Sequence, residues 1–340
     1  MIRTQRRAVL LILLLLCLSV LLSCQKSGEK TLESSPLELT AVMEVDGFEV
    51  PLELYRYVAL NYKADYEAAD PGVWESADMS EKLAELEEKT RETIVRLYAT
   101  PSLCRQYGID TDDAYIRDAV EAQMQDIYEE MGNDYDAFEE YLRTYNLTDG
   151  VYRFIVRNDI LAEELLAKMV ERGEIVSGEE ELEGIVAGPE FVRVKQILVP
   201  SDNGKSDEEN EGRARELYGM AVSGEDFDTL VQKYGGDLFM FNNPDGYYIS
   251  RGNYHEAFEE AAFSLDVGEI SEIVRTDAGW SILKRYEKEA GYLADHFDDL
   301  VNDYMSGVYN MKLEAHASAL TAKPTDKLAE YTVFNLDTTY

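Results

Sequence analysis

The sequence predicts an α+β protein in which a region of mixed strands and helices interrupts a mostly helical chain. Three observations predict it. Apolar residues recur at helical spacing over residues 80–172. A β-branched run, FVRVKQILV at residues 191–199, then begins a region in which short β-prone segments alternate with helical ones. Residues 289–320 return to a long amphipathic helical pattern, which we expect to pack back on the first helices.

The first 23 residues are typical of a secretory signal. Three Arg precede an apolar run at residues 8–16 that is too short for a comfortable spanning helix. The sequence Leu21-Leu22-Ser23-Cys24 resembles the lipobox of bacterial prolipoproteins, with Leu22 where a smaller residue is usual. We therefore expect residues 1–23 to be a lipoprotein signal peptide and Cys24 to carry the lipid. The protein would then be extracytoplasmic and anchored to the cell membrane; an uncleaved anchor is the alternative.

The segment after the signal predicts a tether and then a helical domain. Residues 24–40 are polar and without periodicity, which is typical of a flexible tether. Asp46-Gly47 between two β-prone pieces indicates a hairpin. Four or five amphipathic helices follow, and the glycine-bounded stretch 178–188 marks their end. We expect residues 41–190 to form a helical domain whose apolar stripes are core and groove, not a cofactor site.

The mixed region carries clear signals for its strands and helices. Ser206-Asp-Glu-Glu209 is a capping box in front of a helix that runs to about Val222. A glycine turn, a short aromatic strand, a second glycine and an amphipathic helix follow in the stretch 243–265. Two more strands are expected at Ile273–Thr276 and Trp280–Tyr286, on either side of a turn.

Charge excludes some classes of partner. The chain has 68 acidic against 32 basic side chains, a formal net charge of −36. Nucleic acid needs a basic footprint, so we expect no nucleic-acid partner. A strongly negative surface also disfavours lying flat on an anionic membrane, and it keeps a protein soluble beside a sticky client. An acidic proteome in the source would account for the same composition.

Cysteine and histidine usage indicates neither a disulfide nor a metal site. Cys17 lies in the expected signal and Cys24 would carry lipid, which leaves Cys104 alone. His255, His296 and His316 are far apart, and no Cys/His spacing suggests zinc. We expect no metal and no cofactor.

Residues 191–287 carry a set of motifs that resembles one enzyme family. The motifs are Gln196-Ile-Leu-Val199, GEDFD at 224–228, PDGYYISRG at 244–252, FEEAAFSL at 258–265 and VGEIS at 267–271. Together they resemble the parvulin family of peptidyl-prolyl cis/trans isomerases.

The resemblance extends, more weakly, to most of the chain. With its lipobox and helical flanks, the whole chain is similar to the PrsA-type foldase lipoproteins of Gram-positive bacteria, and residues 41–62 resemble the first helix region of SurA-like chaperones. This implies a parvulin-like β-α-α-α-β-α-β-β domain at 191–287. It would be inserted in a helical chaperone domain built from residues 41–190 and from a C-terminal helix and tail at 288–340.

The chemistry that this family performs breaks no covalent bond. The barrier to rotation of a peptide bond, about 18–20 kcal/mol, comes from amide resonance that is lost when the bond twists. A catalyst needs an apolar slot for the proline ring, dry surroundings, and dipoles that fit the twisted amide better than the planar one. The reaction requires no metal, cofactor or strong nucleophile.

The resemblance assigns candidate site residues. Tyr254 and Phe258 match the family's proline slot, a Met or Leu followed by Phe four positions later, and Tyr248 is a candidate further wall. Asp237 is the nearest match to the acid or Cys beside the twisting amide, and Thr276 matches a hydroxyl position. The alternatives are that Tyr254 and Phe258 are plain core and that Asp237 caps a turn.

Two departures from the family pattern concern its histidine pair. Gln196 stands where the first strand usually has His, and Ser281 stands where the last strand usually has His after Gly-aromatic. Both side chains can hydrogen-bond each other or Thr276, so a polar floor can persist. His255, beside Tyr254, either compensates or is an exposed residue at a helix start.

These residues lead to one functional hypothesis and its alternatives. We expect an extracytoplasmic peptidyl-prolyl cis/trans isomerase and foldase that assists exported proteins at the membrane surface. Its partners would be unfolded or partly folded exported polypeptides. A second copy of the chain, in a homodimer, is a further possible partner. Because Gln196 and Ser281 replace the histidine pair, the alternative is a catalytically weak or inactive holdase chaperone. A cell-surface structural or adhesion lipoprotein is a third interpretation.

Overall fold

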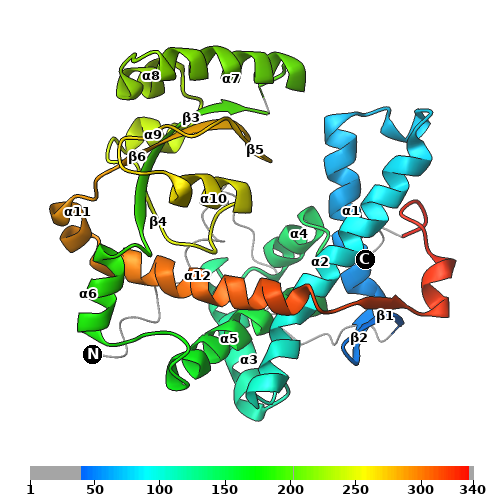
Figure 1. Cartoon of the computed structure of the whole chain (residues 1–340). Helices are drawn as coiled ribbons and strands as arrows, with labels where there is room; N and C mark the ends of the chain where they lie inside the picture. Colours follow the sequence, from blue (N-terminus) through cyan, green and yellow to red (C-terminus); the bar gives the residue numbers. More distant parts are fainter. Residues whose placement is uncertain (1–39, 202, 337–340) are drawn as a thin grey trace. The chain divides into compact units, whose positions relative to one another are not determined.

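The computed structural model describes residues 40–201 and 203–336 (Figure 1). The expected signal peptide at 1–23, the lipid on Cys24 and nearly all of the tether at 24–40 lie outside these residues. Within the described ranges, no helix combines the length and the apolar character needed to cross a membrane.

The hairpin indicated by Asp46-Gly47 is confirmed. Strands β1 (Ala41–Val45) and β2 (Phe48–Pro51) pair antiparallel, and both turn residues have positive φ, 49° and 76°, as this two-residue turn requires. Strand β7 (Ala322–Pro324) pairs with the other edge of β1, which gives a sheet of order β2-β1-β7. Segments from near the two ends of the described chain therefore share one small sheet.

Helices dominate the first half of the described chain. They are α1 (Leu52–Ala69), α2 (Met79–Tyr107), α3 (Ala114–Glu130), α4 (Tyr135–Thr144), α5 (Asp149–Glu171) and α6 (Glu179–Ala187), with 3-10 turns η3 (Val73–Glu75) and, near the C-terminus, η4 (Asp326–Glu330). The side chains of Asp113, Asp134 and Thr148 cap α3, α4 and α5 by accepting first-turn N–H bonds. Pro101 lies within α2 without ending it, and Gly108 ends α2 with φ of 76°.

The helical pattern near the C-terminus returns to these helices, as expected. It forms α11 (Ala290–Asp295) and α12 (Phe297–Ala317), which meet at His296 instead of forming one continuous helix. Apolar side chains of α12 pack on a buried cluster that α2 and α5 supply, with Cys104 fully buried in it. The α+β class, with a helical part built from both ends of the chain, is therefore confirmed.

The mixed region has the element order that the resemblance implies. It comprises β3 (Val192–Pro200), α7 (Asp207–Val222), α8 (Phe227–Tyr234), α9 (Leu238–Asn242), β4 (Tyr247–Ile249), α10 (Glu256–Ser264), β5 (Val274–Thr276) and β6 (Gly279–Tyr286). The capping box at Ser206 and Glu209 begins α7 as expected. The strands form an antiparallel sheet of order β4-β3-β6-β5. Figure 1 shows α7 and α8 on one face of this sheet and α10 on the other.

Alternation along β3 and β6 divides the side chains between two cores. Ile197 and Ile282 face α7 and α8, whereas Val194 and Leu283 pack with Phe258 of α10. Gln196 follows Val194 by two residues, so its side chain lies on the α10 face of the sheet.

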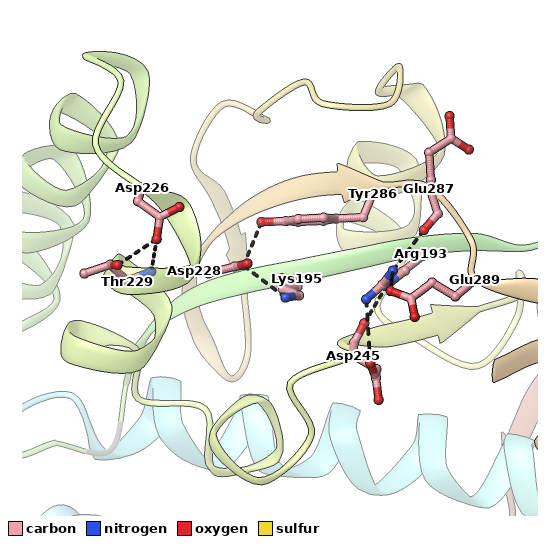
Figure 2. A network of polar contacts seen from close by, with 9 residues as sticks. All are labelled: Arg193, Lys195, Asp226, Asp228, Thr229, Asp245, Tyr286, Glu287 and Glu289. Carbon is pink, nitrogen blue, oxygen red and sulfur yellow. Dashed lines mark hydrogen bonds and ion pairs between the residues drawn. The ribbon is translucent and has the colours of Figure 1, made fainter. Parts of the chain in front are cut away.

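Arg193 ties the beginning of the mixed region to its end (Figure 2). Its side chain is only 8% exposed. Nε donates to the carbonyl of Asp245 at 2.6 Å, and Nη1 donates to the carbonyl of Glu287 at 3.0 Å and to the Glu289 carboxylate. A buried guanidinium is tolerated only when such partners satisfy it. The entry strand, the turn before β4 and the exit segment are therefore held together.

A second contact joins the loop before α10 to α12. Ser250 donates from its backbone N–H and its hydroxyl to Asp303 Oδ2, at 3.2 and 2.6 Å. Asn253 donates to the backbone and side chain of Asp303, at 2.7 and 3.0 Å, and accepts from Asn310. Beside these bonds, Gly307 of α12 meets the loop backbone so closely that a Cβ there would lie 2.0 Å from the carbonyl oxygen of Arg251.

We expect Gly307→Ala to lower the free energy of unfolding by about 1–3 kcal/mol, because overpacking against backbone forces the loop and α12 apart. Gly219→Ala is the matched control. Gly219 also lies in a helix, α7, but a Cβ there meets nothing within 4 Å, so the substitution should gain up to about 1 kcal/mol from helix propensity. Urea unfolding of both variants measures the difference. If the two substitutions change the free energy of unfolding by the same amount, the loop and α12 are not in tight contact.

Candidate functional site

Four polar side chains form a hydrogen-bonded chain on the α10 face of the sheet. Ser281 donates from Oγ to Gln196 Oε1 at 2.8 Å, and Gln196 Nε2 donates to Asp237 Oδ2 at 2.5 Å. Tyr247 donates from its hydroxyl to the same Asp237 oxygen at 2.8 Å. Gln196 and Ser281, which stand where the resemblance led us to expect a histidine pair, therefore do bond each other, and they connect the sheet to the candidate acid.

Asp237 reaches the sheet because of the two glycines before it. The N–H of Gly236 donates to the carbonyl of Leu198 at 2.8 Å, and a Cβ on Gly236 would lie 2.5 Å from the ring of Pro200. The other carboxylate oxygen, Oδ1, accepts from the backbone N–H of Phe239 at 2.8 Å and of Met240 at 3.4 Å. Asp237 therefore caps α9 and belongs to the polar chain at the same time.

Tyr247 supplies a neutral hydroxyl to this site. Burial, and next the hydrogen bond to the Asp237 carboxylate, raise the pKa of Tyr247 far above its ordinary value. The phenol therefore stays protonated at any physiological pH. Gln196 and Ser281 do not titrate, so these three members of the chain keep the same protonation state across the neutral range.

Tyr254 and Phe258 form an aromatic wall beside the polar chain. Their rings stack at a centroid distance of 5.7 Å and an interplanar angle of 25°. Tyr247 meets them edge-on, at 6.0 Å from Tyr254 and 6.3 Å from Phe258. Phe258 is only 6% exposed and also belongs to the core under α10, whereas Tyr254 is 36% exposed. Phe258 is therefore the base of this wall and Tyr254 its accessible rim.

Glu259 holds the loop that carries Tyr254, and sequence reasoning missed it. Glu259 is 7% exposed, and its Oε1 accepts from the N–H groups of Gly252, Asn253 and Tyr254 at 2.7, 3.0 and 2.9 Å. A buried carboxylate with three backbone donors is a strong local constraint. The sequence did contain a signal for this role, because Glu259 directly follows Phe258 inside the motif that carries the resemblance.

Three sequence-predicted residues lie elsewhere. Tyr248 points to the opposite face of β4 from Tyr247, where its ring stacks on Tyr292 at 4.0 Å. Thr276 is buried at the end of β5, opposite Gly279, and its side chain does not bond the polar chain. His255 caps α10, accepting from Ala257 N–H at 3.2 Å, and is exposed.

A further feature of the described residues is an apolar cavity of about 140 Å³ in the helical part. Its lining comes from the hairpin, α2 and α5 and consists of Ala41, Phe48, Glu49, Pro51, Tyr98, Phe154 and Arg157. Across residues 40–201 and 203–336, no group of three or more His, Cys, Asp or Glu side chains is arranged to hold a metal ion.

Comparison with known proteins gives matches in the same region and beyond it. Foldase protein PrsA of Caldanaerobacter subterraneus is 30% identical over 192 residues, which cover 53% of this chain and 55% of that protein. Chaperone SurA of Nitrosococcus oceani is 30% identical over 107 residues, 31% of this chain and 25% of that protein. The chain therefore spans between a quarter and just over half of the length of these relatives.

Among solved structures, peptidylprolyl isomerase PrsA from Bacillus anthracis is similar with a TM-score of 0.35 and 18% identity, over 66% of this chain and 94% of that one. Residues 193–287 match the family model described as Rotamase: PPIC-type PPIASE domain. This match covers the β-α-α-α-β-α-β-β unit that carries the polar chain and the aromatic wall. Residues 193–287 are therefore a parvulin-type (PPIC-type) peptidyl-prolyl isomerase domain.

Proposed function

We propose that this protein is an extracytoplasmic peptidyl-prolyl cis/trans isomerase and foldase that assists the folding of exported proteins at the membrane surface. The observation that carries the proposal is the Ser281–Gln196–Asp237–Tyr247 chain beside the exposed rim at Tyr254. Residues 191–287 act on prolines, whereas residues 41–190 and 288–340 hold the client. The apolar cavity in the helical part supports this second role, because it can accept an apolar side chain of an unfolded polypeptide.

The geometry supports a mechanism without proton transfer. The proline ring packs against Tyr254 and Phe258, and the preceding carbonyl lies toward Asp237. Resonance places negative charge on the oxygen of a planar amide, and a fixed carboxylate nearby disfavours that charge. Twisting the bond reduces the charge, so the site favours the twisted amide over the planar one. Hydrogen bonds from Gln196 and Tyr247 fix the carboxylate in place before the client binds.

A lipid anchor on Cys24 is part of this proposal, supported by the lipobox-like sequence. Mass spectrometry of the membrane-extracted protein should find a chain that begins at Cys24 and carries diacylglycerol. Cys24→Ser should release the protein from the membrane fraction, and Cys17→Ser is the matched control. Retention of Cys24→Ser in the membrane would indicate an uncleaved anchor instead.

We expect the purified protein to accelerate cis/trans exchange of a short Xaa-Pro peptide, as measured by NMR. Asp237→Asn should lower kcat/KM by about 10²-fold, because the substitution removes a preorganised charge. It should leave α9 capped, because Asn is as good a capping residue as Asp. Asp266→Asn, at an exposed position of the same domain, should leave the rate unchanged. No acceleration by stoichiometric wild-type protein would remove the enzyme assignment.

The same exchange measurement across pH checks that no imidazole takes part. Because Gln196 and Ser281 do not titrate and Tyr247 stays protonated, we expect kcat/KM to be flat between about pH 6 and pH 8, the range in which histidine changes charge. A sigmoidal change of kcat/KM within this range would contradict a site without imidazole.

The second candidate function is a holdase, favoured by the absence of the family's histidine pair at Gln196 and Ser281. We expect the wild-type protein to suppress aggregation of a reduced model client, measured by light scattering. Asp237→Asn should suppress aggregation equally well, because holding a client needs apolar surface and not the carboxylate. Loss of suppression in Asp237→Asn would show that holding and isomerisation share one site.

A further inference from the structure

Helix α9 exposes a cluster of apolar side chains beside the isomerase site. Leu238 is 79% exposed, Phe241 is 63% and Phe239 is 43%. Tyr254, the accessible rim of the aromatic wall, is 36% exposed. The other large exposed hydrophobic residues of the described chain, such as Val222 and Met311, are not neighbours in the sequence. Neighbouring exposed apolar side chains of this kind are typical of a binding surface.

The exposed side chains belong to an element that is held in place. Met240, in the middle of α9, is 2% exposed and packs in the core under α7 and α8. Asp237 caps the helix start, and Asn242 and Asn243 each donate a side-chain bond to a carbonyl of α9, at 3.0 Å. The apolar side chains are therefore presented on a short helix that is anchored in the core.

The surface of α9 is continuous with the proline slot. The ring of Phe239 stacks on Tyr247 at 4.4 Å and 15°, and Tyr247 contacts both Tyr254 and Phe258 edge-on. Asp237 joins the two parts a second time, since one oxygen caps α9 and the other belongs to the polar chain. One residue of extended chain spans about 3.5 Å. When the proline of a client lies against Tyr254, the residue next to the proline can therefore reach the side chains of α9.

We propose that α9 is a specificity subsite that binds an aromatic or large aliphatic side chain next to the proline of an extended client polypeptide. This inference rests on the proposed function, because it names the substrate class of the same site. The carboxylate of Asp237 and the net charge of −36 disfavour an acidic neighbour of the proline. The preferred client segments are therefore apolar ones, which are the segments that an unfolded protein exposes and a folded protein buries.

The test uses the full chain and short peptides in which the residue before or after proline is Phe, Ala or Glu. We expect kcat/KM for the best Phe peptide to exceed that for its Ala counterpart by about 10-fold, as apolar pockets discriminate. The Glu peptides should be poorest. In the double variant Leu238→Ser/Phe241→Ser, the ratio of kcat/KM for the Phe peptide to kcat/KM for the Ala peptide should fall toward one. The matched control is Val222→Ser, which removes a similarly exposed apolar residue from the end of α7 and should keep the wild-type ratio.

The outcomes separate this inference from the proposed function. Catalysis without any preference for Phe, or a preference that survives the double substitution, would overturn the subsite and leave the isomerase intact. If the wild-type protein does not catalyse exchange, peptide Kd values from NMR titration replace kcat/KM, and the same ratios decide. Analytical ultracentrifugation of the wild-type protein and of the double variant measures whether either protein self-associates. A dimer that the double substitution dissociates, with an unchanged peptide preference, would assign α9 to a contact between two copies and overturn the inference.

Discussion

The carboxylate of Asp237 is the contact on which the site depends. One oxygen accepts hydrogen bonds from Gln196 of β3 and from Tyr247 of β4. The other oxygen accepts hydrogen bonds from two N–H groups of α9. Three elements that are separate in the chain therefore meet at one side chain. Because buried polar groups need partners, loss of this carboxylate leaves both donors unsatisfied. The close approach of Gly236 to β3 is what allows the carboxylate to reach them.

The aromatic rim depends on two further carboxylates, which bind the same loop from two different helices, α10 and α12. Glu259 binds the backbone of the loop from within the domain, and Asp303 binds Ser250 and Asn253 from α12. Burial raises the pKa of Asp303 above its ordinary value, and the donated hydrogen bonds oppose that shift. The position of Tyr254 is thus shared between the isomerase domain and the helical part. The helical part therefore helps to set the geometry of the aromatic wall.

Local patterns were sufficient for most of the fold. Asp46-Gly47 predicted the hairpin because only residues that tolerate positive φ suit its turn. The capping box at Ser206 predicted the start of α7. The motifs from Gly224 onward predicted the isomerase domain, and Tyr254, which was expected as a wall of the proline slot, is 36% exposed. The break at His296 was not predicted, since the apolar stripe continues through it.

The sequence by itself determined most of the elements, their order and the parvulin-type domain at 193–287, because each of these depends on neighbours along the chain. Only the tertiary structure decided which of two adjacent tyrosines faces the site. Tyr247 and Tyr248 are equally suited to a strand, and a shift of one residue in register would exchange them. The same holds for the bond between Gln196 and Ser281, which are 85 residues apart, and for the burial of Glu259. Such contacts depend on how the sheet pairs and packs, which no local pattern encodes.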